Sequence, residues 1–336
     1  MTVEGPVLIT GGAGFIGSAL VRQLAAGGLD VVAVDNLANG KARNLDDVPG
    51  GYVRLEVADI RDTERMAPLI AGSRTVFHLA CLGVRHSIHA PVENHRVNAE
   101  ATLGLLELAR HWGRPRFVHV SSSEVYGTAK RVPMDEDHPT LPHTVYGASK
   151  LAGECYARAY HDTYGMATTV VRPFNAFGPR CHHEGDSGEV IPKFLLRAMA
   201  GRPLIVFGDG SQTRDFTYVE DTARGIAAAA RPAAIGRTVN LGSGAEISIR
   251  ELAELVSAVA GRNTSTVETA AARPGDVMRL YADVTAARSL LEFQPRVSLR
   301  DGLEQLRDWY AAQPESVADR LRDEVVVNWA VGNAAP

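Results

Sequence analysis

The sequence lacks the features that mark membrane-spanning, secreted and nucleic-acid-binding proteins. In 336 residues, no apolar run reaches the roughly 18 residues that a helix needs to cross a bilayer. No charged-then-apolar signal segment precedes the first strand-like run, VLIT. The net charge is −4 and basic residues are nowhere concentrated, so we expect neither a membrane nor a nucleic acid as a partner.

Cysteine is also scarce. The three cysteines, Cys81, Cys155 and Cys181, are unevenly spaced, which argues against a disulfide framework and fits a reducing compartment. We therefore predict a cytoplasmic protein. The composition, 45% hydrophobic and 22% charged, is typical of globular proteins, and the length suits one large domain or two moderate ones.

Over the first two thirds of the chain, apolar strand-like runs alternate with amphipathic helical runs. This alternation predicts an α/β fold with a doubly wound parallel sheet of the Rossmann type and right-handed crossovers. The expected helices lie near 15–27, 62–71, 94–112 and 147–164. Beyond residue 175 the pattern loosens, and there we expect a loop at 179–188, a helix near 191–200, more helix within 265–310 and a helical tail from about 312.

A glycine-rich turn joins the first strand to the first helix. In LITGGAGFIGSAL, Gly11, Gly14 and Gly17 are spaced as G-x-x-G-x-x-G, with Phe15 and Ile16 between the last two. Glycines at this spacing permit a tight turn, close approach of backbone to a pyrophosphate, and close packing of helix on strand. The strand–turn–helix context favours a dinucleotide site over a glycine-rich turn without a ligand, because a helix N-terminus attracts phosphate.

Acidic residues end the next strands. Asp35, followed by Asn36, ends the second strand about 20 residues after the glycines. A carboxylate there suits free ribose hydroxyls and repels a 2′-phosphate, so NAD is favoured over NADP. Capping of the following loop is the alternative role for Asp35. Asp59 and Ile60 follow the third strand and are expected near the adenine.

These features suggest how the chain is divided. We predict an NAD-binding domain over residues 1–175 and a smaller, interleaved C-terminal substrate domain, mainly 176–336. Strands near 203–220 and 237–243 are expected to return to the sheet of the first domain.

A tyrosine and a lysine stand four residues apart in YGASK. On a helix, Tyr146 and Lys150 share one face. An ammonium beside a phenol favours the phenolate, which can take a proton from a hydroxyl while hydride leaves the adjacent carbon. The alternative is an ordinary solvated helix face. The glycine-rich turn and the serines of SSSEVYG, which follow the strand-like RFVHV, favour the catalytic interpretation.

The motifs TGGAGFIGS, HLA, SSSEVYG, YGASK, RPFNAFGPR and FGDGSQTRDFTYVED occur in an order that resembles the extended short-chain dehydrogenases/reductases. More narrowly, they resemble the NAD-dependent nucleotide-sugar epimerases and dehydratases, over roughly residues 5–310. The resemblance implies an isomerase or lyase that binds NAD and a nucleoside-diphosphate sugar. It also implies a homodimer formed by the helices near 94–112 and 147–164, although these helices could equally pack within one chain.

The same resemblance assigns residue roles. Tyr146 would be the base, Lys150 its orienter and a ribose contact, and Ser122 their hydroxyl partner. Leu79 and Ala80 of HLA would contact the cofactor. The substrate residues implied are Ser87, Asn175, Arg214, Arg273 and Asp276, with the arginines on the diphosphate. For each arginine, a surface ion pair is the alternative.

Glu124, in the middle of SSSEVYG, bears on which reaction is run. The family oxidises C4 of the sugar transiently, and the resulting ketone leads to 4-epimerisation, to dehydration after loss of the C5 proton, or to decarboxylation of a uronate. The dehydratases and decarboxylases of the family resemble this sequence in having a glutamate at the position of Glu124. The resemblance therefore makes Glu124 a candidate for the base that removes the C5 proton.

Other residues favour 4-epimerisation. Ser123 stands where dTDP-glucose dehydratases carry an aspartate, and Glu189 is a poor neighbour for a uronate carboxylate. We therefore predict 4-epimerisation of a UDP-hexose or hexuronate. The alternative enzymes are a 4,6- or 5,6-dehydratase, a decarboxylase and a 3,5-epimerase. For Glu124 itself, the alternative to a C5 base is a purely structural role. UDP itself is an expectation taken from the family.

Two further interpretations are kept open and one is set aside. A non-catalytic NAD-binding sensor would be expected to lack Tyr146 or Lys150, and an ordinary dehydrogenase would release NADH. The histidines and acids of CHHEGD (181–186) match no zinc spacing, so we predict no metal.

Overall fold

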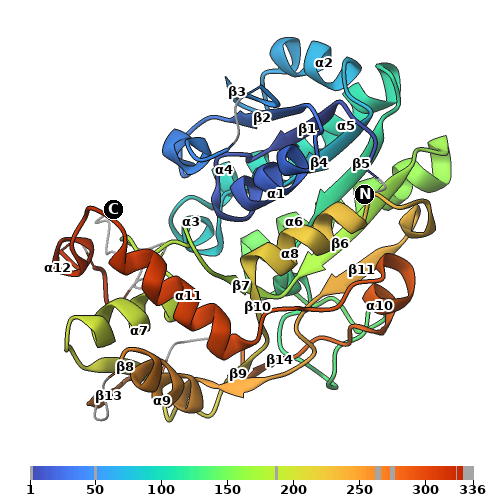
Figure 1. Cartoon of the computed structure of the whole chain (residues 1–336). Coiled ribbons are helices and arrows are strands. Elements are labelled where there is room, and N and C mark those ends of the chain that lie inside the picture. Colours follow the sequence, from blue (N-terminus) through green and yellow to red (C-terminus); the bar gives the residue numbers. More distant parts are fainter. Residues whose placement is uncertain are drawn as a thin grey trace, which may run out of the picture.

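A seven-stranded parallel sheet forms the centre of the larger lobe, the upper one in Figure 1. The structure is a computed structural model that describes residues 3–48, 51–185, 188–261, 266–272, 277–322 and 324–327. From edge to edge the strands are β11 (Thr238–Leu241), β6 (Thr168–Pro173), β5 (Arg116–Val120), β4 (Thr75–His78), β1 (Val7–Thr10), β2 (Val31–Asp35) and β3 (Val53–Val57). The order reverses beside β1, as in doubly wound sheets. The predicted α/β fold with a doubly wound parallel sheet is confirmed.

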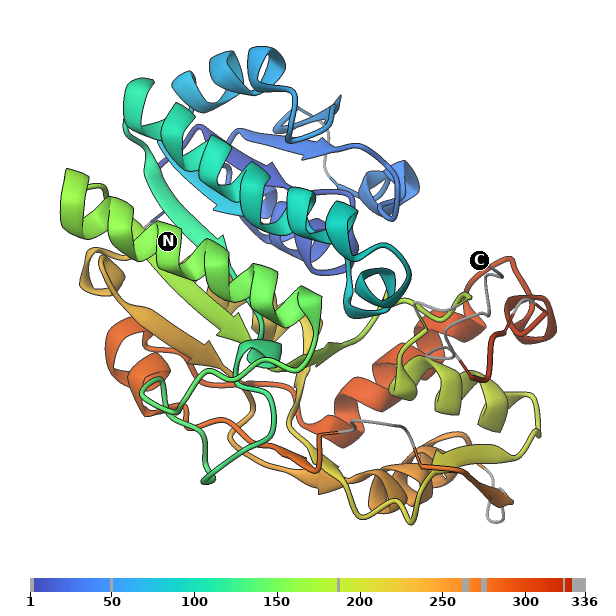
Figure 2. The same ribbon diagram turned by 180° about the vertical axis from the view of Figure 1, so that it is seen from behind.

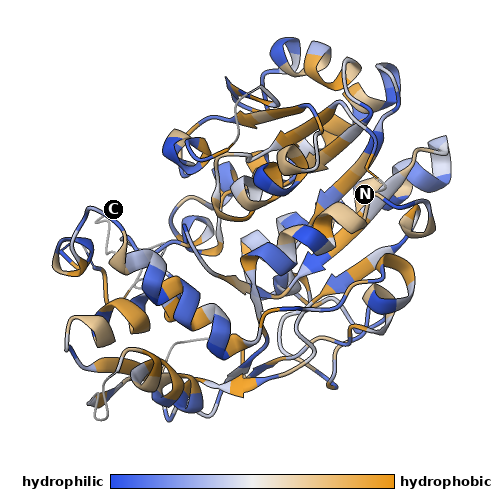
Figure 3. Cartoon of the chain, in the orientation of Figure 1, coloured by the Kyte–Doolittle hydropathy of each residue, from blue (hydrophilic) through white to orange (hydrophobic). Residues whose placement is uncertain are grey.

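Helices cover both faces of this sheet, which explains why its central strands are mostly apolar (Figure 3). On one face α1 (Phe15–Ala26) packs against α8 (Val219–Ala228), with α10 (Thr285–Leu291) beside α8. The opposite face, turned forward in Figure 2, carries α2 (Thr63–Ala71), α5 (Ala101–His111) and α6 (Val145–Tyr164). Successive side chains of β1 enter different cores, because Ile9 belongs to the first layer and Leu8 to the second.

Local sequence sets the ends of the long helix α6. The Thr144 hydroxyl accepts a hydrogen bond from the Gly147 amide at 3.0 Å, so Thr144 is the N-cap. Gly165, at φ 63°, ends the helix in the left-handed conformation that glycine adopts readily. Ahead of α5, the chain passes through α3 (Val84–His89), α4 (Pro91–His95) and a π turn, Arg96–Glu100. The helix expected near 94–112 therefore begins earlier, at Pro91.

The smaller lobe is built from short sheets and four helices among the described residues. The helices are α7 (Val190–Met199), α9 (Ile249–Val259), α11 (Leu299–Ala311) and α12 (Val317–Arg320). The strands pair as β7 (Asn175–Phe177) with β10 (Phe216–Tyr218), β8 (Leu204–Phe207) with β13 (Val267–Ala270), and β9 (Thr213–Arg214) with β12 (Ile247–Ser248) and β14 (Arg279–Leu280). None of the helices in the described part of the chain is long and apolar enough to span a membrane.

Three expectations need correction here. The strand near 237–243 does lie in the main sheet, as β11, but the strands within 203–220 pair in the smaller lobe instead. Helices α8 and α9 were not expected, and FTYVED turns from strand to helix at Val219. In the described part of the tail beyond 312, the one helix is the short α12. The division at residue 175 stays a prediction.

Candidate functional site

A cleft of about 1070 Å³ runs between the two lobes, along the carboxyl ends of the sheet strands. This edge of a doubly wound sheet is where ligands bind in such folds. The structure brings most of the predicted site residues to this one cleft. Those that line it are Gly11, Gly14, Phe15, Ile16, Gly17, Asp35, Asn36, Asp59, Ile60, Leu79, Ala80, Ser122, Ser123, Glu124, Tyr146, Lys150, Asn175 and Arg214.

The glycine-rich turn is packed so closely that side chains are excluded from it. Gly11 has φ 71°, and a Cβ there would lie 2.8 Å from the Ala80 amide nitrogen. A Cβ on Gly17 would lie 2.0 Å from the Gly11 carbonyl oxygen. The turn leads directly into α1, whose N-terminal end lies at the cleft. A bare backbone cradle at a helix N-terminus fits a dinucleotide pyrophosphate.

The acidic residues beside the turn are held in fixed positions. Buried Asp35 accepts hydrogen bonds from the amides of Ala13 at 3.1 Å and Leu37 at 2.9 Å. It therefore caps its loop and lines the cleft, and burial raises the pKa of its carboxyl. Hydrogen bonds from Arg61 lower the pKa of Asp59 to about 2, so Asp59 stays ionised. This edge of the cleft carries negative charge, which suits ribose hydroxyls better than an extra phosphate.

Tyr146 and Lys150 lie on the first turns of α6 and face the cleft. The hydroxyl of Ser122 accepts the Glu124 amide at 3.2 Å and hydrogen-bonds the Tyr146 phenol. Burial raises the pKa of Tyr146, and the hydrogen bond from Ser122 opposes this shift. Burial also lowers the pKa of Lys150. Enclosure thus disfavours both the phenolate and the ammonium, which opposes the activation expected from Lys150.

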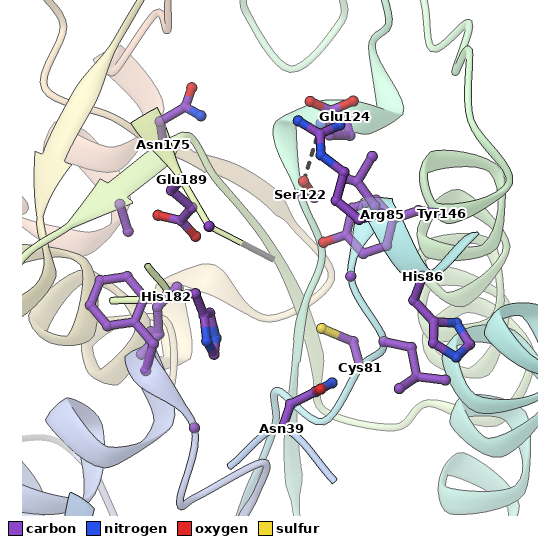
Figure 4. A pocket seen from close by; sticks show the side chains of 18 of the residues that line it. Asn39, Cys81, Arg85, His86, Ser122, Glu124, Tyr146, Asn175, His182 and Glu189 are labelled. Carbon is purple, nitrogen blue, oxygen red and sulfur yellow. Dashed lines mark hydrogen bonds between the residues drawn. The ribbon is translucent and has the colours of Figure 1, made fainter. Parts of the chain in front are cut away.

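Two carboxylates flank the phenol from opposite walls. Figure 4 shows Glu124 with Ser122 and Tyr146 on one wall, and Glu189 with Asn175 and His182 on the other. Both carboxylates raise the pKa of Tyr146 electrostatically, after the larger effects of burial and Cys81. Glu189 is open to the cleft, yet the surrounding walls raise its pKa to about 8. Ser123 lies beside Glu124 and offers a hydroxyl rather than an acid.

A buried polar network joins the two segments that carry the predicted catalytic residues. Glu154, two turns after Tyr146 on α6, accepts hydrogen bonds from Ser121 Oγ at 2.5 Å and from Arg172 at 2.9 and 2.7 Å. Arg172 also donates to the Tyr126 hydroxyl at 2.8 Å. Burial acts to raise the pKa of Glu154, but the hydrogen bonds and charge of Arg172, the hydrogen bond from Ser121 and the charge of Arg158 together lower it. The network fixes Ser121 and Tyr126, which bracket Ser122 to Glu124, against α6.

The predicted substrate residues are only partly brought together. Asn175 and Arg214 line the cleft, and the buried Oδ1 of Asn175 has no hydrogen-bond partner among the described residues. Arg214 donates to the Val277 carbonyl at 2.6 Å. Ser87 does not reach the cleft, because its hydroxyl donates to the Val84 carbonyl at 2.7 Å. Arg273 and Asp276 lie outside the described residues.

Sequence reasoning missed the apolar wall of the smaller lobe and the return of the tail. Ile205 and Phe207 of β8, Phe216 of β10 and Ile249 of α9 line the cleft, and so do Glu324 and Val326 near the C-terminus. No local motif marks these positions, since only the tertiary fold brings them to the cleft. Among the described residues, no cluster of His, Cys, Asp or Glu could hold a metal ion.

Known proteins share both this sequence pattern and this fold. The family model described as GDP-mannose 4,6 dehydratase matches residues 8–306. The UDP-glucose 4-epimerase of Mycolicibacterium smegmatis is 37% identical over 309 residues, 90% of this chain and 97% of that protein. The dTDP-glucose 4,6-dehydratase of Streptomyces griseus is 37% identical over 311 residues, 90% of this chain and 93% of that protein.

A solved structure is also similar. A double mutant of the dTDP-glucose 4,6-dehydratase of Streptomyces venezuelae, crystallised with NAD, superposes with a TM-score of 0.86 at 34% identity. The match covers 92% of this chain and 97% of that one.

Proposed function

The chain belongs to the extended short-chain dehydrogenase/reductase family of nucleotide-sugar epimerases and dehydratases, and we propose that it is an NAD-dependent 4-epimerase of a UDP-hexose. One observation carries the proposal. A single cleft joins the glycine cradle to the Tyr146–Lys150 pair, while the place beside Glu124 is filled by the hydroxyl of Ser123. The M. smegmatis relative is named for this reaction.

The chain's own residues account for binding and proton transfer. The turn from Gly11 to Gly17 and the carboxylate of Asp35 would hold NAD, which supplies reversible hydride acceptance at C4 of the sugar. Tyr146 takes the proton of the C4 hydroxyl and returns it after the sugar has presented its other face. Ser122 fixes the phenol by its hydrogen bond. The ammonium of Lys150 would favour the phenolate electrostatically, against the burial that disfavours it.

Dehydration is the second candidate, and one observation favours it. Glu124 lines the cleft near the catalytic phenol, where a carboxylate could take a C5 proton. Elimination of a C6 hydroxyl also needs an acid for the leaving group. Ser123 is a poor acid, since an alcohol gives up its proton far less readily than a carboxylic acid. We therefore assign Glu124 a structural and electrostatic role.

Proton NMR in deuterium oxide separates the two reactions. The panel would include UDP-glucose, UDP-glucuronate, UDP-GlcNAc, dTDP-glucose and GDP-mannose. We expect inversion at C4 with no deuterium on carbon, because the hydride returns from the enclosed cofactor. The Glu124→Gln variant should keep at least a third of the turnover. Deuterium at C5, with loss of water or carbon dioxide and inactivity of Glu124→Gln, would establish the lyase reaction instead.

Replacement of the catalytic phenol tests whether the chain is an enzyme. Tyr146→Phe should lower kcat by at least about 100-fold, within the range for loss of a general base, while NAD binding stays unchanged. Unchanged turnover would remove Tyr146 from the mechanism. No turnover of any nucleotide sugar by the unmodified protein would favour the non-catalytic sensor, and net NADH release would mark an ordinary dehydrogenase.

We further propose a homodimer formed through α5 and α6. These helices lie side by side on the outer face of the sheet (Figure 2), and Leu103, Val145 and Tyr164 on them are exposed. Sedimentation equilibrium should give twice the chain mass, and Leu103→Glu should shift the protein to monomer. A monomer at micromolar concentration would contradict this proposal. The cytoplasmic location stays a prediction from cysteine usage.

A further inference from the structure

The segment after α11 returns to the cleft. It forms α12 and then runs beside α7, so that Glu324 and Val326 line the same cavity as the glycine turn and Tyr146. Figure 1 shows α12 next to α7 in the smaller lobe. These residues lie after residue 306, where the match to the family model ends. The tail is thus a part of the cleft wall that the family match does not account for.

Polar contacts tie the end of this segment to α7 and its preceding loop. Arg197 Nε donates to Glu324 Oε1 at 2.8 Å, and the two side chains are only 11% and 7% exposed. Lys193 Nζ donates to the Val325 carbonyl at 2.8 Å. Glu324 also forms a parallel bridge with Gly185. A buried, hydrogen-bonded ion pair fixes geometry more firmly than an exposed one, which adds little.

The start of the segment is packed as well. Leu321 is buried, and the guanidinium of Arg320 lies 5.9 Å from the Trp309 ring centre and 5.6 Å from that of Tyr310. Arg320 also pairs with Glu315 at 3.3 Å. The tail therefore packs against side chains of α11 before it reaches the cleft.

Glu324 lies at the end of the cleft that is distant from Tyr146. Glu189, the N-cap of α7, is followed at four-residue intervals by Lys193 and Arg197 on the helix, and all three line the cleft. Glu189 lies across from Tyr146 (Figure 4), and Arg197 is eight residues further on, roughly 12 Å along the helix. Arg197 also donates to the Pro203 carbonyl at 2.8 Å, next to β8. The tail thus joins the wall formed by α7 and β8, with Ile205 and Phe207 facing the cleft.

We propose that Glu324 and Val326 of the tail form part of the substrate site and close its nucleotide end. This inference rests on the proposed function, in which the sugar lies at Tyr146 and the nucleoside diphosphate extends along the smaller lobe. The pair with Arg197 neutralises the Glu324 carboxylate, so Glu324 adds no unpaired negative charge to the wall that faces the phosphates. Val326 adds apolar surface that excludes water from the bound nucleotide.

The test compares two shortened proteins with UDP-glucose as substrate. One ends at Ala312, and the other ends at Val327 and keeps every cleft-lining residue that the structure describes. We expect the chain ending at Ala312 to show a KM at least tenfold higher, kcat within threefold and unchanged NAD content. A KM within twofold of that of the longer chain would overturn the inference.

Point variants in the full chain cover the case in which the shorter chain does not fold. Glu324→Ala should raise KM for UDP-glucose and Kd for UDP three- to tenfold. Glu315→Ala breaks a tail ion pair outside the cleft and should change neither by more than twofold. If Glu324→Ala behaves like Glu315→Ala, the tail is not part of the site. If the unmodified chain binds NAD but converts no nucleotide sugar, the proposed function fails instead.

Discussion

Removal of Glu154 should separate the stability and catalytic roles of the buried network. Glu154 is fully buried, and Arg172 is 3% exposed. Glu154→Ala leaves the guanidinium of Arg172 in the core without its carboxylate. Breaking one partner of a buried pair costs about 3–5 kcal/mol, a large part of the 5–15 kcal/mol typical of folded domains. Urea denaturation followed by circular dichroism measures this loss.

The matched control is Asp135→Ala, which breaks an exposed pair. Arg131 lies 2.6 Å from Asp135, with both side chains about half exposed, so the expected loss is at most about 0.5 kcal/mol. Equal losses in Glu154→Ala and Asp135→Ala would refute the argument from burial.

A double variant then isolates the effect on catalysis. Glu154→Leu with Arg172→Met removes both charges and should restore stability to near the starting value, since apolar replacements of buried pairs are often neutral. Ser121 loses its hydrogen bond to Glu154, and Tyr126 keeps only the one it donates to Asn240, so the loop that carries Ser122 should shift from α6. We expect kcat to fall at least tenfold with KM within threefold. A stable double variant with kcat within twofold would show that the network serves folding alone.

Three further predictions each concern the substitution of a single residue. Gly17→Ala should lower the NAD content of the purified protein at least tenfold. The control Gly104→Ala has nothing within 4 Å of the added Cβ and should leave the NAD content unchanged. Equal NAD contents in the two variants would contradict a role of the glycine turn in NAD binding. Burial lowers the pKa of His78 to about 3. The free energy of unfolding should therefore fall by about 1.4 kcal/mol per pH unit as pH falls from about 6.5 towards 3. In urea titrations His78→Gln should reduce this pH dependence, and an unchanged dependence would exclude His78 as its source. Asp35→Asn should lower the ratio of NADP to NAD dissociation constants at least tenfold by calorimetry, unless a group other than Asp35 excludes the 2′-phosphate.

The first lobe and its half of the site could be predicted because their signals are local. The glycine spacing and Tyr146–Lys150 depend on backbone geometry within a few residues, and strand–helix alternation places them at one sheet edge. The smaller lobe offered no such periodicity. IRELAELVSAV does carry helix signals, since Ser248 and Glu251 form a capping box, but its short neighbouring strands obscured them. Glu324 reaches the cleft through contacts with α7, 127 residues away in sequence, which no motif encodes.

Ser87 and Tyr146 show where residue identity was a weaker guide than environment. A serine in a family-like position satisfied its hydroxyl locally, on the Val84 carbonyl, once its segment formed α3. The phenol is in place, but its charge state depends on enclosure by the cleft and on both flanking carboxylates, which sequence spacing alone does not give.

The choice between epimerisation and dehydration therefore depends on very few side chains within a shared framework. In the proposed mechanism the cradle, Tyr146 and the Glu154–Arg172 network would serve C4 oxidation in either reaction, because both proceed through the same ketone. What differs is whether a second acid stands next to Glu124 when the C5 proton can be lost. In this chain that place holds Ser123, and this difference is why we propose 4-epimerisation. The shared framework is also consistent with the comparisons, in which a 4-epimerase and a 4,6-dehydratase are each 37% identical to this chain.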